Sequence, residues 1–89
     1  MDFLIVTGLS GAGKSRTVDA LEDIGFFCID NMPPKLISKF AEIATQSGSK
    51  LSKVAVVTDV RGGELFNDFI EELDLLKTLD FSYKLLFLD

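Results

Sequence analysis

The sequence predicts an α/β fold built around one parallel sheet, and two features of the chain lead to this prediction. First, short apolar runs alternate with segments in which apolar residues recur at helical spacing, an order typical of parallel sheets with right-handed crossovers. Second, a glycine-rich stretch joins the first apolar run directly to the first helical pattern. We expect strands at 3–6, 26–29, 54–58 and 83–88, and helices at about 13–24, 34–45 and 64–77.

Composition fits one small globular domain and excludes several classes of protein. The 89 residues are 47% hydrophobic and 26% charged, which is typical of a folded chain. With 9 basic and 14 acidic residues the net charge is −5, so the chain is a poor stand-alone binder of nucleic acid. It has no histidine and one cysteine, Cys28, which excludes disulfides within the chain, Cys/His zinc sites and histidine triads.

The same features predict where the chain resides. A single cysteine, expected in the core and not as a reactive thiol, suits a reducing, cytoplasmic setting. We expect no signal peptide, because the first strand starts without a basic segment before it. We also expect no membrane span, since no apolar run approaches the roughly 20 residues that a bilayer requires.

The first strand and the first helix are expected on either side of the glycine-rich stretch. Residues 3–6 are continuously apolar, which suits a strand covered on both faces. The helix should end near Gly25, a natural C-terminal stop, and Arg16 should lie on its surface with some electrostatic pull on phosphates. Its apolar side should carry Val18, Leu21 and Ile24, and its outer side Arg16, Asp19, Glu22 and Asp23.

Prolines and glycines mark the boundaries of the other elements. The second strand runs into Asp30-Asn31-Met32-Pro33-Pro34, where the prolines end the strand and can open the next helix. The third strand runs into Asp59-Val60-Arg61-Gly62-Gly63, and the third helix follows. The predicted buried stripes are Leu36, Ile37, Phe40, Ala41, Ile43 and Ala44 on the second helix, and Leu65, Phe66, Phe69, Ile70, Leu73 and Leu76 on the third.

The glycine-rich stretch, Gly8-Leu9-Ser10-Gly11-Ala12-Gly13-Lys14-Ser15, matches the phosphate-binding P-loop, or Walker A motif, G-x-x-x-x-G-K-[ST]. Its glycines let backbone N–H groups point at a phosphate chain, and the positive end of the following helix adds to that field. Lys14 is placed to reach the β- and γ-phosphates of a nucleotide, and the Ser15 hydroxyl to bind Mg²⁺. The alternative is a turn that only joins strand to helix, but such a turn has no need of the Gly-Lys-Ser ending. We therefore predict a P-loop NTPase fold of three layers.

Two further loops should meet the P-loop at the carboxyl edge of the sheet, where parallel sheets bind their ligands. Asp59 ends an apolar strand, the position of a Walker B acid that holds Mg²⁺ opposite Ser15, although it could instead cap the turn before Gly62. Arg61 could contact a phosphate, a guanine or a ribose edge, or could be a surface arginine. Asp30 could orient or deprotonate the hydroxyl of a phosphate acceptor, but an Asx turn before the prolines is the preferred interpretation.

Three stretches together resemble the N-terminal end of the bacterial RapZ/YvcJ family of P-loop nucleotide-binding proteins. They are the P-loop, the run Ala20-Leu21-Glu22-Asp23-Ile24-Gly25-Phe26-Phe27-Cys28-Ile29-Asp30-Asn31-Met32-Pro33-Pro34, which is the most specific, and Asp59-Val60-Arg61. The resemblance covers the whole chain and implies a P-loop NTPase (kinase-like) domain that binds ATP and GTP and hydrolyses both weakly. The implied nucleotide-binding residues are Gly8, Leu9, Ser10, Gly11, Ala12, Gly13, Lys14, Ser15, Asp59, Val60, Arg61 and Gly62, with Lys14 and Asp59 in catalysis and Ser15 and Asp59 on the metal.

The resemblance also implies parts outside residues 1–89. Members of this family have a C-terminal domain, which in enterobacterial members binds small regulatory RNA and an amino-sugar phosphate and makes the protein an adapter of a ribonuclease. Members outside that group can have a different regulatory role. We therefore expect residues 1–89 to form a partial nucleotide-binding domain, truncated after about the fourth strand and without RNA binding of its own.

Three functional hypotheses follow from the sequence. The first is a weak ATPase or GTPase, slow because no water-orienting residue is evident beside the P-loop. The second is a small-molecule kinase in which Asp30 lies near the acceptor. The third is a regulatory adapter whose binding of partners depends on the nucleotide. The sequence leaves open the preference between ATP and GTP, the acceptor, the protein partners and the oligomeric state.

Overall fold

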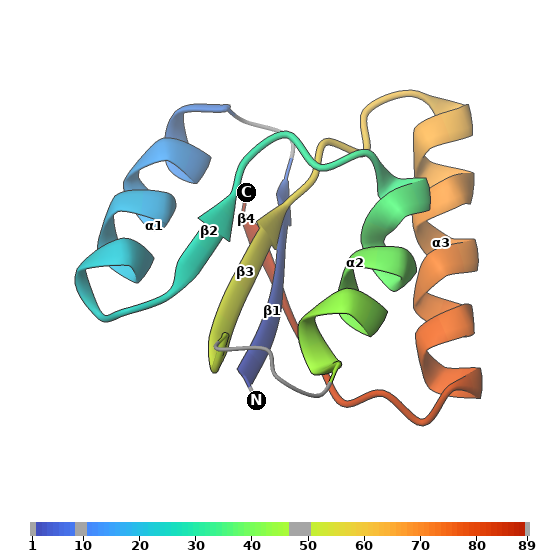
Figure 1. The fold of residues 1–89 in the computed structure, drawn as a ribbon. Helices are drawn as coiled ribbons and strands as arrows, with labels where there is room; N and C mark the ends of the chain where they lie inside the picture. Colours follow the sequence, from blue (N-terminus) through green and yellow to red (C-terminus); the bar gives the residue numbers. More distant parts are fainter. Residues whose placement is uncertain (1, 9–10, 47–50, 89) are drawn as a thin grey trace.

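A sheet of four parallel strands, in the order β2-β3-β1-β4, forms the middle of the fold (Figure 1). The computed structural model describes residues 2–8, 11–46 and 51–88 of the chain. This sheet confirms the predicted α/β class and its parallel strands. The strands are β1 (Asp2–Gly8), β2 (Phe27–Ile29), β3 (Lys53–Val57) and β4 (Lys84–Leu88).

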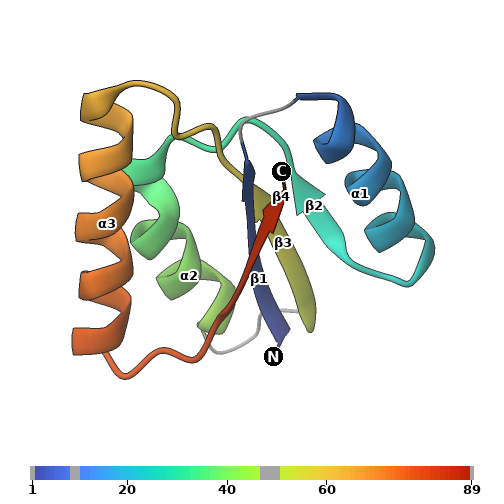
Figure 2. The ribbon, with the colours of Figure 1, turned by 180° about the vertical axis from the view of Figure 1, so that it is seen from behind.

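Helices cover both faces of this sheet. α1 (Gly11–Asp23) lies on one face, whereas α2 (Ile37–Thr45) and α3 (Gly63–Thr78) lie on the other, which gives the three predicted layers (Figures 1 and 2). α1 contacts β1 and β2, while α3 contacts α2 and η1 (Pro34–Leu36), the short 3-10 turn that leads into α2. None of the helices in the described part of the chain is long and apolar enough to cross a membrane.

The second helix differs from the prediction at its start. The sequence predicts one helix from about Pro34, whereas the structure has the 3-10 turn η1 before α2 begins at Ile37. Pro33 is extended (φ −62°, ψ 133°), because a residue that precedes a proline is kept away from the helical region. The Leu36 N–H then donates to the Pro33 carbonyl at 3.0 Å, which closes the tighter turn. α1 begins at Gly11 and β3 at Lys53, slightly earlier than predicted.

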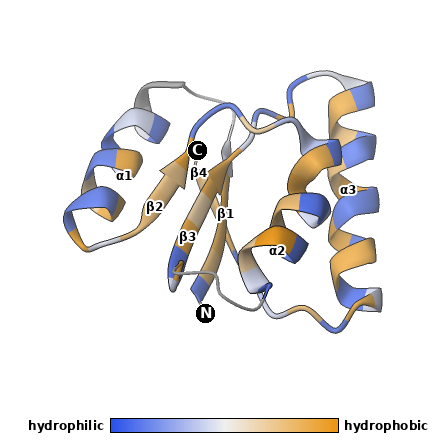
Figure 3. Ribbon diagram, in the orientation of Figure 1, coloured by the Kyte–Doolittle hydropathy of each residue, from blue (hydrophilic) through white to orange (hydrophobic). Residues whose placement is uncertain are grey.

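The hydrophobic core lies between the sheet and the layer of α2 and α3. Figure 3 shows the apolar character of β1 and β3 between helices that are polar on their outer sides. The ring of Phe3 packs edge-on against that of Phe81, with 5.2 Å between the ring centroids. The Glu72 carboxylate on α3 accepts a hydrogen bond of 2.9 Å from the Ser38 N–H, which stabilises the start of α2. The core residues are Phe3, Ile5, Met32, Ile37, Ala41, Ala44, Val54, Val56, Val60, Phe69 and Leu76.

The predicted apolar stripes are wider than the surfaces that are buried. On α3 only Phe69 and Leu76 are buried, and Leu73 packs against the core. The reason is that α3 lies against η1 and α2, so only the side of the helix that faces them is covered. The prediction was wrong for the exposed members of the stripes, which are Leu65, Phe66 and Ile70 on α3, Ile43 on α2, Leu36 on η1, and Ile24 just after α1.

β4 lies at one edge of the described sheet, with β1 as its only neighbour there. Its register pairs Leu85 with Ile5 and Phe87 with Thr7, so these two side chains lie on the same face as the core. They are nevertheless 46% and 54% exposed. The edge strand of the described sheet therefore combines an open backbone edge with large apolar side chains.

Candidate functional site

The candidate P-loop begins where β1 ends and continues into α1. Gly8 is the last residue of β1, and Gly13, Lys14 and Ser15 lie in the first turns of α1, which starts at Gly11. Lys14 is half-buried and Ser15 is exposed. The predicted strand–loop–helix order is therefore present, while Leu9 and Ser10 lie outside the described residues. The side chain of Ala12 is also outside the described part of the structure.

Gly8 is glycine for a reason that the sequence does not reveal. A Cβ placed on Gly8 would overlap the main-chain carbonyl oxygen of Leu88 and lie only 2.9 Å from its carbonyl carbon. Gly8 and Leu88 are also register partners in the pairing of β1 with β4. A Cβ on Gly13, in contrast, would meet no atom of the described residues within 4 Å beyond its own stretch of helix backbone. Close packing of two backbones therefore requires the first glycine of the motif, whatever its role toward phosphate.

Lys14 and Ser15 share a pocket with both of the other predicted loops. The pocket has a volume of about 210 Å³ and lies beyond the carboxyl ends of β2 and β3. Parallel sheets bind their ligands at this edge. Its walls are formed by Lys14, Ser15, Asp30, Asn31, Val57, Thr58, Asp59 and Arg61.

Two predicted residues of the third loop do not line this pocket. Val60 is 6% exposed and belongs to the hydrophobic core, so it anchors the loop between Asp59 and Arg61. Gly62 has a φ of 94°, a left-handed conformation that favours glycine, and it stands at the N-terminal end of α3. The structure thus places Val60 and Gly62 where they shape the loop.

The carboxylate of Asp59 is held by Arg61 through both of its oxygens. The guanidinium donates from Nη2 to Oδ2 at 2.7 Å and from Nε to both oxygens at 3.0 to 3.1 Å, and the Arg61 N–H donates to Oδ1 at 2.9 Å. These bonds, first those of the side chain and then that of the backbone, lower the pKa of Asp59 from 3.8 to about 2, and the charge of Lys14 adds to the effect. Since the Arg61 side chain is 64% exposed, the pair adds little to stability, but it keeps Asp59 ionised and oriented.

The pKa of Asp59 leads to a prediction about pH. Because the folded pKa lies below the ordinary 3.8, the contact with Arg61 favours the fold above that pH, and this contribution is lost as the pH falls toward about 2. In Arg61→Gln we expect the pKa of Asp59 to rise back toward its ordinary value, as measured by NMR titration of the carboxyl carbon. Arg16→Gln, which replaces an exposed arginine on α1, should leave that pKa unchanged. An unchanged Asp59 titration in Arg61→Gln would contradict the assignment of its cause.

Asp30 and Asn31 enter the pocket from the turn after β2. The Asn31 N–H donates to Asp30 Oδ1 at 2.8 Å, and Asn31 has a left-handed φ of 58°, which asparagine tolerates better than most residues. The backbone of Met32 is fastened to the end of β3, because its N–H donates to the Val57 carbonyl and its carbonyl accepts from the Thr58 hydroxyl, both at 2.7 Å. An Asx turn would instead use the N–H two residues on, which here donates to Val57, so the predicted Asx turn is not formed by Asp30. Asp30 does line the same pocket as Lys14.

The donors in this pocket suit Mg²⁺, which prefers oxygen ligands. Ser15 offers a hydroxyl and Asp59 an ionised carboxylate, and both line the pocket. Among the residues that the structure describes, no group of three or more His, Cys, Asp and Glu side chains gathers to hold a metal ion. A Mg²⁺ ion at Ser15 and Asp59 would therefore take its remaining ligands from phosphate and water, as Mg²⁺ does at nucleotide sites.

Cys28 lies away from this pocket and behaves as a packing residue. It is half-buried on β2, and its thiol points to the Val18 carbonyl on α1 with an S···O distance of 3.9 Å. Burial, together with the nearby charge of Glu22, raises the pKa of the thiol and so disfavours the reactive thiolate.

Thr58 lines the pocket but was not predicted as a site residue from the sequence. The signal that could have identified it is its hydroxyl group at the end of an apolar strand, directly before Asp59.

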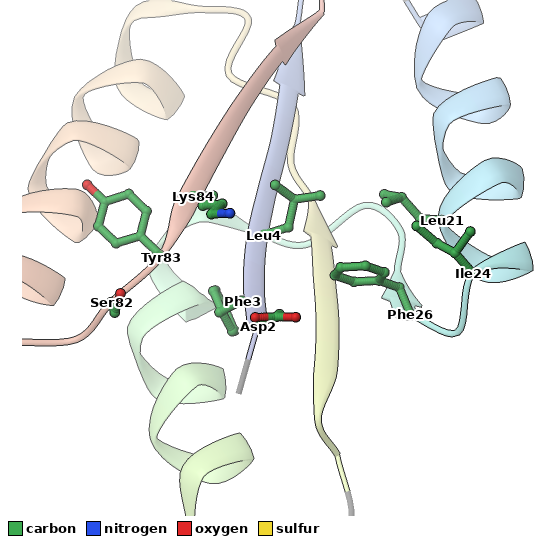
Figure 4. A pocket seen from close by; sticks show the side chains of 9 residues that line it. All are labelled: Asp2, Phe3, Leu4, Leu21, Ile24, Phe26, Ser82, Tyr83 and Lys84. Carbon is green, nitrogen blue, oxygen red and sulfur yellow. The ribbon is translucent and has the colours of Figure 1, made fainter.

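A larger groove of about 340 Å³ lies away from all these residues. It is bounded by the start of β1, the start of β4 and the end of α1, and its side chains include Leu4, Leu21, Phe26 and Tyr83 (Figure 4). None of the predicted site residues lines it. The larger groove thus contains none of the side chains expected to bind phosphate or Mg²⁺. We therefore place the functional site at the smaller, more polar pocket.

The parallel sheet, the glycine-rich junction between β1 and α1 and the acidic strand end beside it define a P-loop α/β domain. The chain belongs to the family described as the RapZ-like N-terminal domain, whose sequence profile matches residues 1–89. This confirms the resemblance found in the sequence.

Similar proteins in clostridia and their relatives are longer than this chain. A nucleotide-binding protein of Clostridium beijerinckii is 61% identical over 89 residues, which are 100% of this chain and 30% of the relative. A nucleotide-binding protein of Acetivibrio thermocellus is 62% identical over 100% of this chain and 31% of its own length. The chain thus spans about 30% of the length of these relatives.

Proposed function

We propose that the chain binds the phosphates of ATP or GTP, together with Mg²⁺, between the start of α1 and the loop from Asp59 to Arg61, and that it hydrolyses them slowly. The observation that carries this proposal is the pocket in which Lys14 and Ser15 meet Asp59 and Arg61. The names of its relatives, which are called nucleotide-binding proteins, support it.

Each side chain has a role that its chemistry suits. The Lys14 ammonium would neutralise the β- and γ-phosphates, and the N-terminal end of α1 adds favourable field. Ser15 and Asp59 would hold Mg²⁺, which when bound draws charge from the phosphates and orients them. Arg61, whose side chain is 64% exposed, would orient the Asp59 carboxylate from within the same pocket through its forked guanidinium.

The walls of the pocket also bear on the choice between nucleotides. Among the described residues that line the pocket, Val57 is the only hydrophobic one, and none of them has an aromatic ring on which a base could stack. Recognition by these residues would therefore depend on phosphate and Mg²⁺, and we expect ATP and GTP to bind to them with similar affinity. From the family resemblance we also propose a regulatory role of the longer protein, with any RNA contacts made outside residues 1–89. The single cysteine supports the proposal of a cytoplasmic location.

Removing the charge of Lys14 tests the binding proposal. In Lys14→Met, which keeps most of the aliphatic stem, we expect the affinity for Mg·ATP to fall about 30-fold, because a charge-assisted hydrogen bond to phosphate is lost. Isothermal titration of the chain would measure this change. Lys35→Met is the matched control, because Lys35 is exposed on η1 and does not line the pocket. Equal affinities of the wild type and Lys14→Met would refute the proposal.

A second function, transfer of phosphate to a small molecule, is favoured by one observation. Asp30 lies in the same pocket as Lys14 and Ser15, where its carboxylate could orient an acceptor hydroxyl. Incubating γ-labelled nucleotide with a panel of metabolites distinguishes the two functions. Hydrolysis releases the label only as free phosphate, whereas a kinase places it on one of the metabolites.

A further inference from the structure

Thr58 joins three segments that surround the candidate phosphate pocket. It follows β3 directly, precedes Asp59, and is 0% exposed. Its hydroxyl donates to the Met32 carbonyl at 2.7 Å, and its N–H donates to the Val6 carbonyl of β1 at 2.9 Å. One buried residue thus connects the end of β1, the turn after β2 and the loop that carries Asp59.

The bond to Met32 fixes the wall of the pocket that lies opposite α1. Met32 is 7% exposed and anchored in the core, and the two residues before it, Asp30 and Asn31, line the pocket. The Met32 N–H makes a second short bond, of 2.7 Å, to the Val57 carbonyl. Without the Thr58 hydroxyl, the Met32 carbonyl would lose this partner, and a buried carbonyl without a partner favours rearrangement of its segment.

We propose that Thr58 is a positioning residue of the phosphate pocket, whose hydroxyl sets the distance between Asp30 and Asn31 on one wall and Lys14 and Ser15 on the other. This inference rests on the proposed function, because the pocket is taken to hold phosphate and Mg²⁺. Thr58 acts through the turn of residues 30–32 and needs no contact of its own with the nucleotide.

The chain contains a matched control for this residue. Thr7 is also a threonine with 0% exposure, and the register pair Val6–Val57 makes Thr7 and Thr58 the next residues along neighbouring strands. The Thr7 hydroxyl, however, has no hydrogen-bond partner among the residues that the structure describes. Replacing threonine by valine therefore removes a hydrogen bond at Thr58, whereas at Thr7 it removes none that the described residues make.

The experiment compares Thr58→Val, Thr58→Ser and Thr7→Val in the full chain by titration with Mg·ATP at a temperature where each is folded. Thr58→Val should bind about fivefold more weakly, because the loss of a buried hydrogen bond loosens one wall of the pocket. Thr58→Ser and Thr7→Val should stay within about twofold of the wild type, since the first keeps the hydroxyl and the second loses a hydroxyl that bonds to none of the described residues. Equal affinities of Thr58→Val and the wild type would overturn the inference.

A double-mutant cycle separates positioning from general weakening of the fold. In the background D30A/N31A, where the positioned side chains are absent, adding Thr58→Val should have less than about a twofold further effect on binding. The same fivefold loss in both backgrounds would show that the effect of Thr58 does not pass through Asp30 and Asn31, and would overturn the inference.

Hydrogen exchange gives a reading that does not depend on the variants. Mg·ATP should slow the exchange of the Met32 amide of the wild type, because the wall that it anchors becomes occupied. Unchanged exchange in a wild type that binds Mg·ATP would count against the positioning role. A wild type that binds no Mg·ATP would refute the proposed function itself, and the two failures are thereby distinguished.

Discussion

Gly8→Ala should lower the free energy of unfolding by about 3 kcal/mol, because the added methyl group has no space between two paired backbones. The methyl would overlap the Leu88 carbonyl oxygen. A flexible side chain could move away, but a main-chain carbonyl in a strand cannot shift without breaking the pairing of β1 with β4. We therefore expect the end of β4 to separate from β1, which would be seen as faster hydrogen exchange of amides near Leu88 together with a lower urea midpoint.

Gly13→Ala is the control for this prediction. It changes a glycine of the same motif that lies inside α1, where a Cβ meets none of the described residues within 4 Å beyond its own stretch of helix backbone. Alanine is a better helix former than glycine, so we expect stability to stay the same or to rise by up to about 1 kcal/mol. Equal stability of Gly8→Ala and the wild type would show that β4 does not pack on Gly8 as the structure describes.

Phe69→Ala should cost about 4 kcal/mol of unfolding free energy, the usual loss for a large aromatic side chain in a core. Phe69 is 4% exposed and is part of the core between α3 and the sheet. Its removal would leave a cavity that the surrounding β-branched and aliphatic side chains fill only partly. The measurement is urea unfolding at several concentrations of a stabilising osmolyte, so that a weakly stable variant is still folded at the start.

Phe66→Ala provides the comparison on the same helix. Phe66 lies less than one turn from Phe69 and is 50% exposed, so its truncation should cost less than about 1 kcal/mol. The helical spacing of the sequence assigned both rings to the buried stripe. If Phe66→Ala and Phe69→Ala lost similar amounts of unfolding free energy, both rings would be buried, which would contradict the exposure of Phe66 in the structure.

The sequence was sufficient for the parts of the fold that depend on local pattern. Continuous apolar runs such as 54–58 identify covered strands, and their alternation with helical patterns implies parallel pairing. The same rule placed Ser15, Asp30 and Asp59 at one edge of the sheet, and the structure brings them into one pocket. These features depend on periodicity and chain order, which a single sequence displays.

Other features depend on which segments become neighbours, and a single sequence does not display this. The exposure of Phe66 follows from the place of α3 against η1 and α2. The need for glycine at position 8 follows from a strand that arrives 80 residues later in the chain, at Leu88. The role of Thr58 depends on a hydrogen bond to Met32, 26 residues away. In each case the cause is a tertiary contact, for which helical or strand periodicity carries no signal.

The edge strand β4 has a consequence for the behaviour of the chain in solution. After Lys84 its residues are all uncharged, and Leu85 and Phe87 are 46% and 54% exposed beside an open backbone edge. Natural edge strands usually carry charges, prolines or bulges that prevent further strands from adding to them. β4 has one such device, the lysine at its start. For these 89 residues we therefore expect salt, which screens the repulsion of a net charge of −5, to favour association through β4.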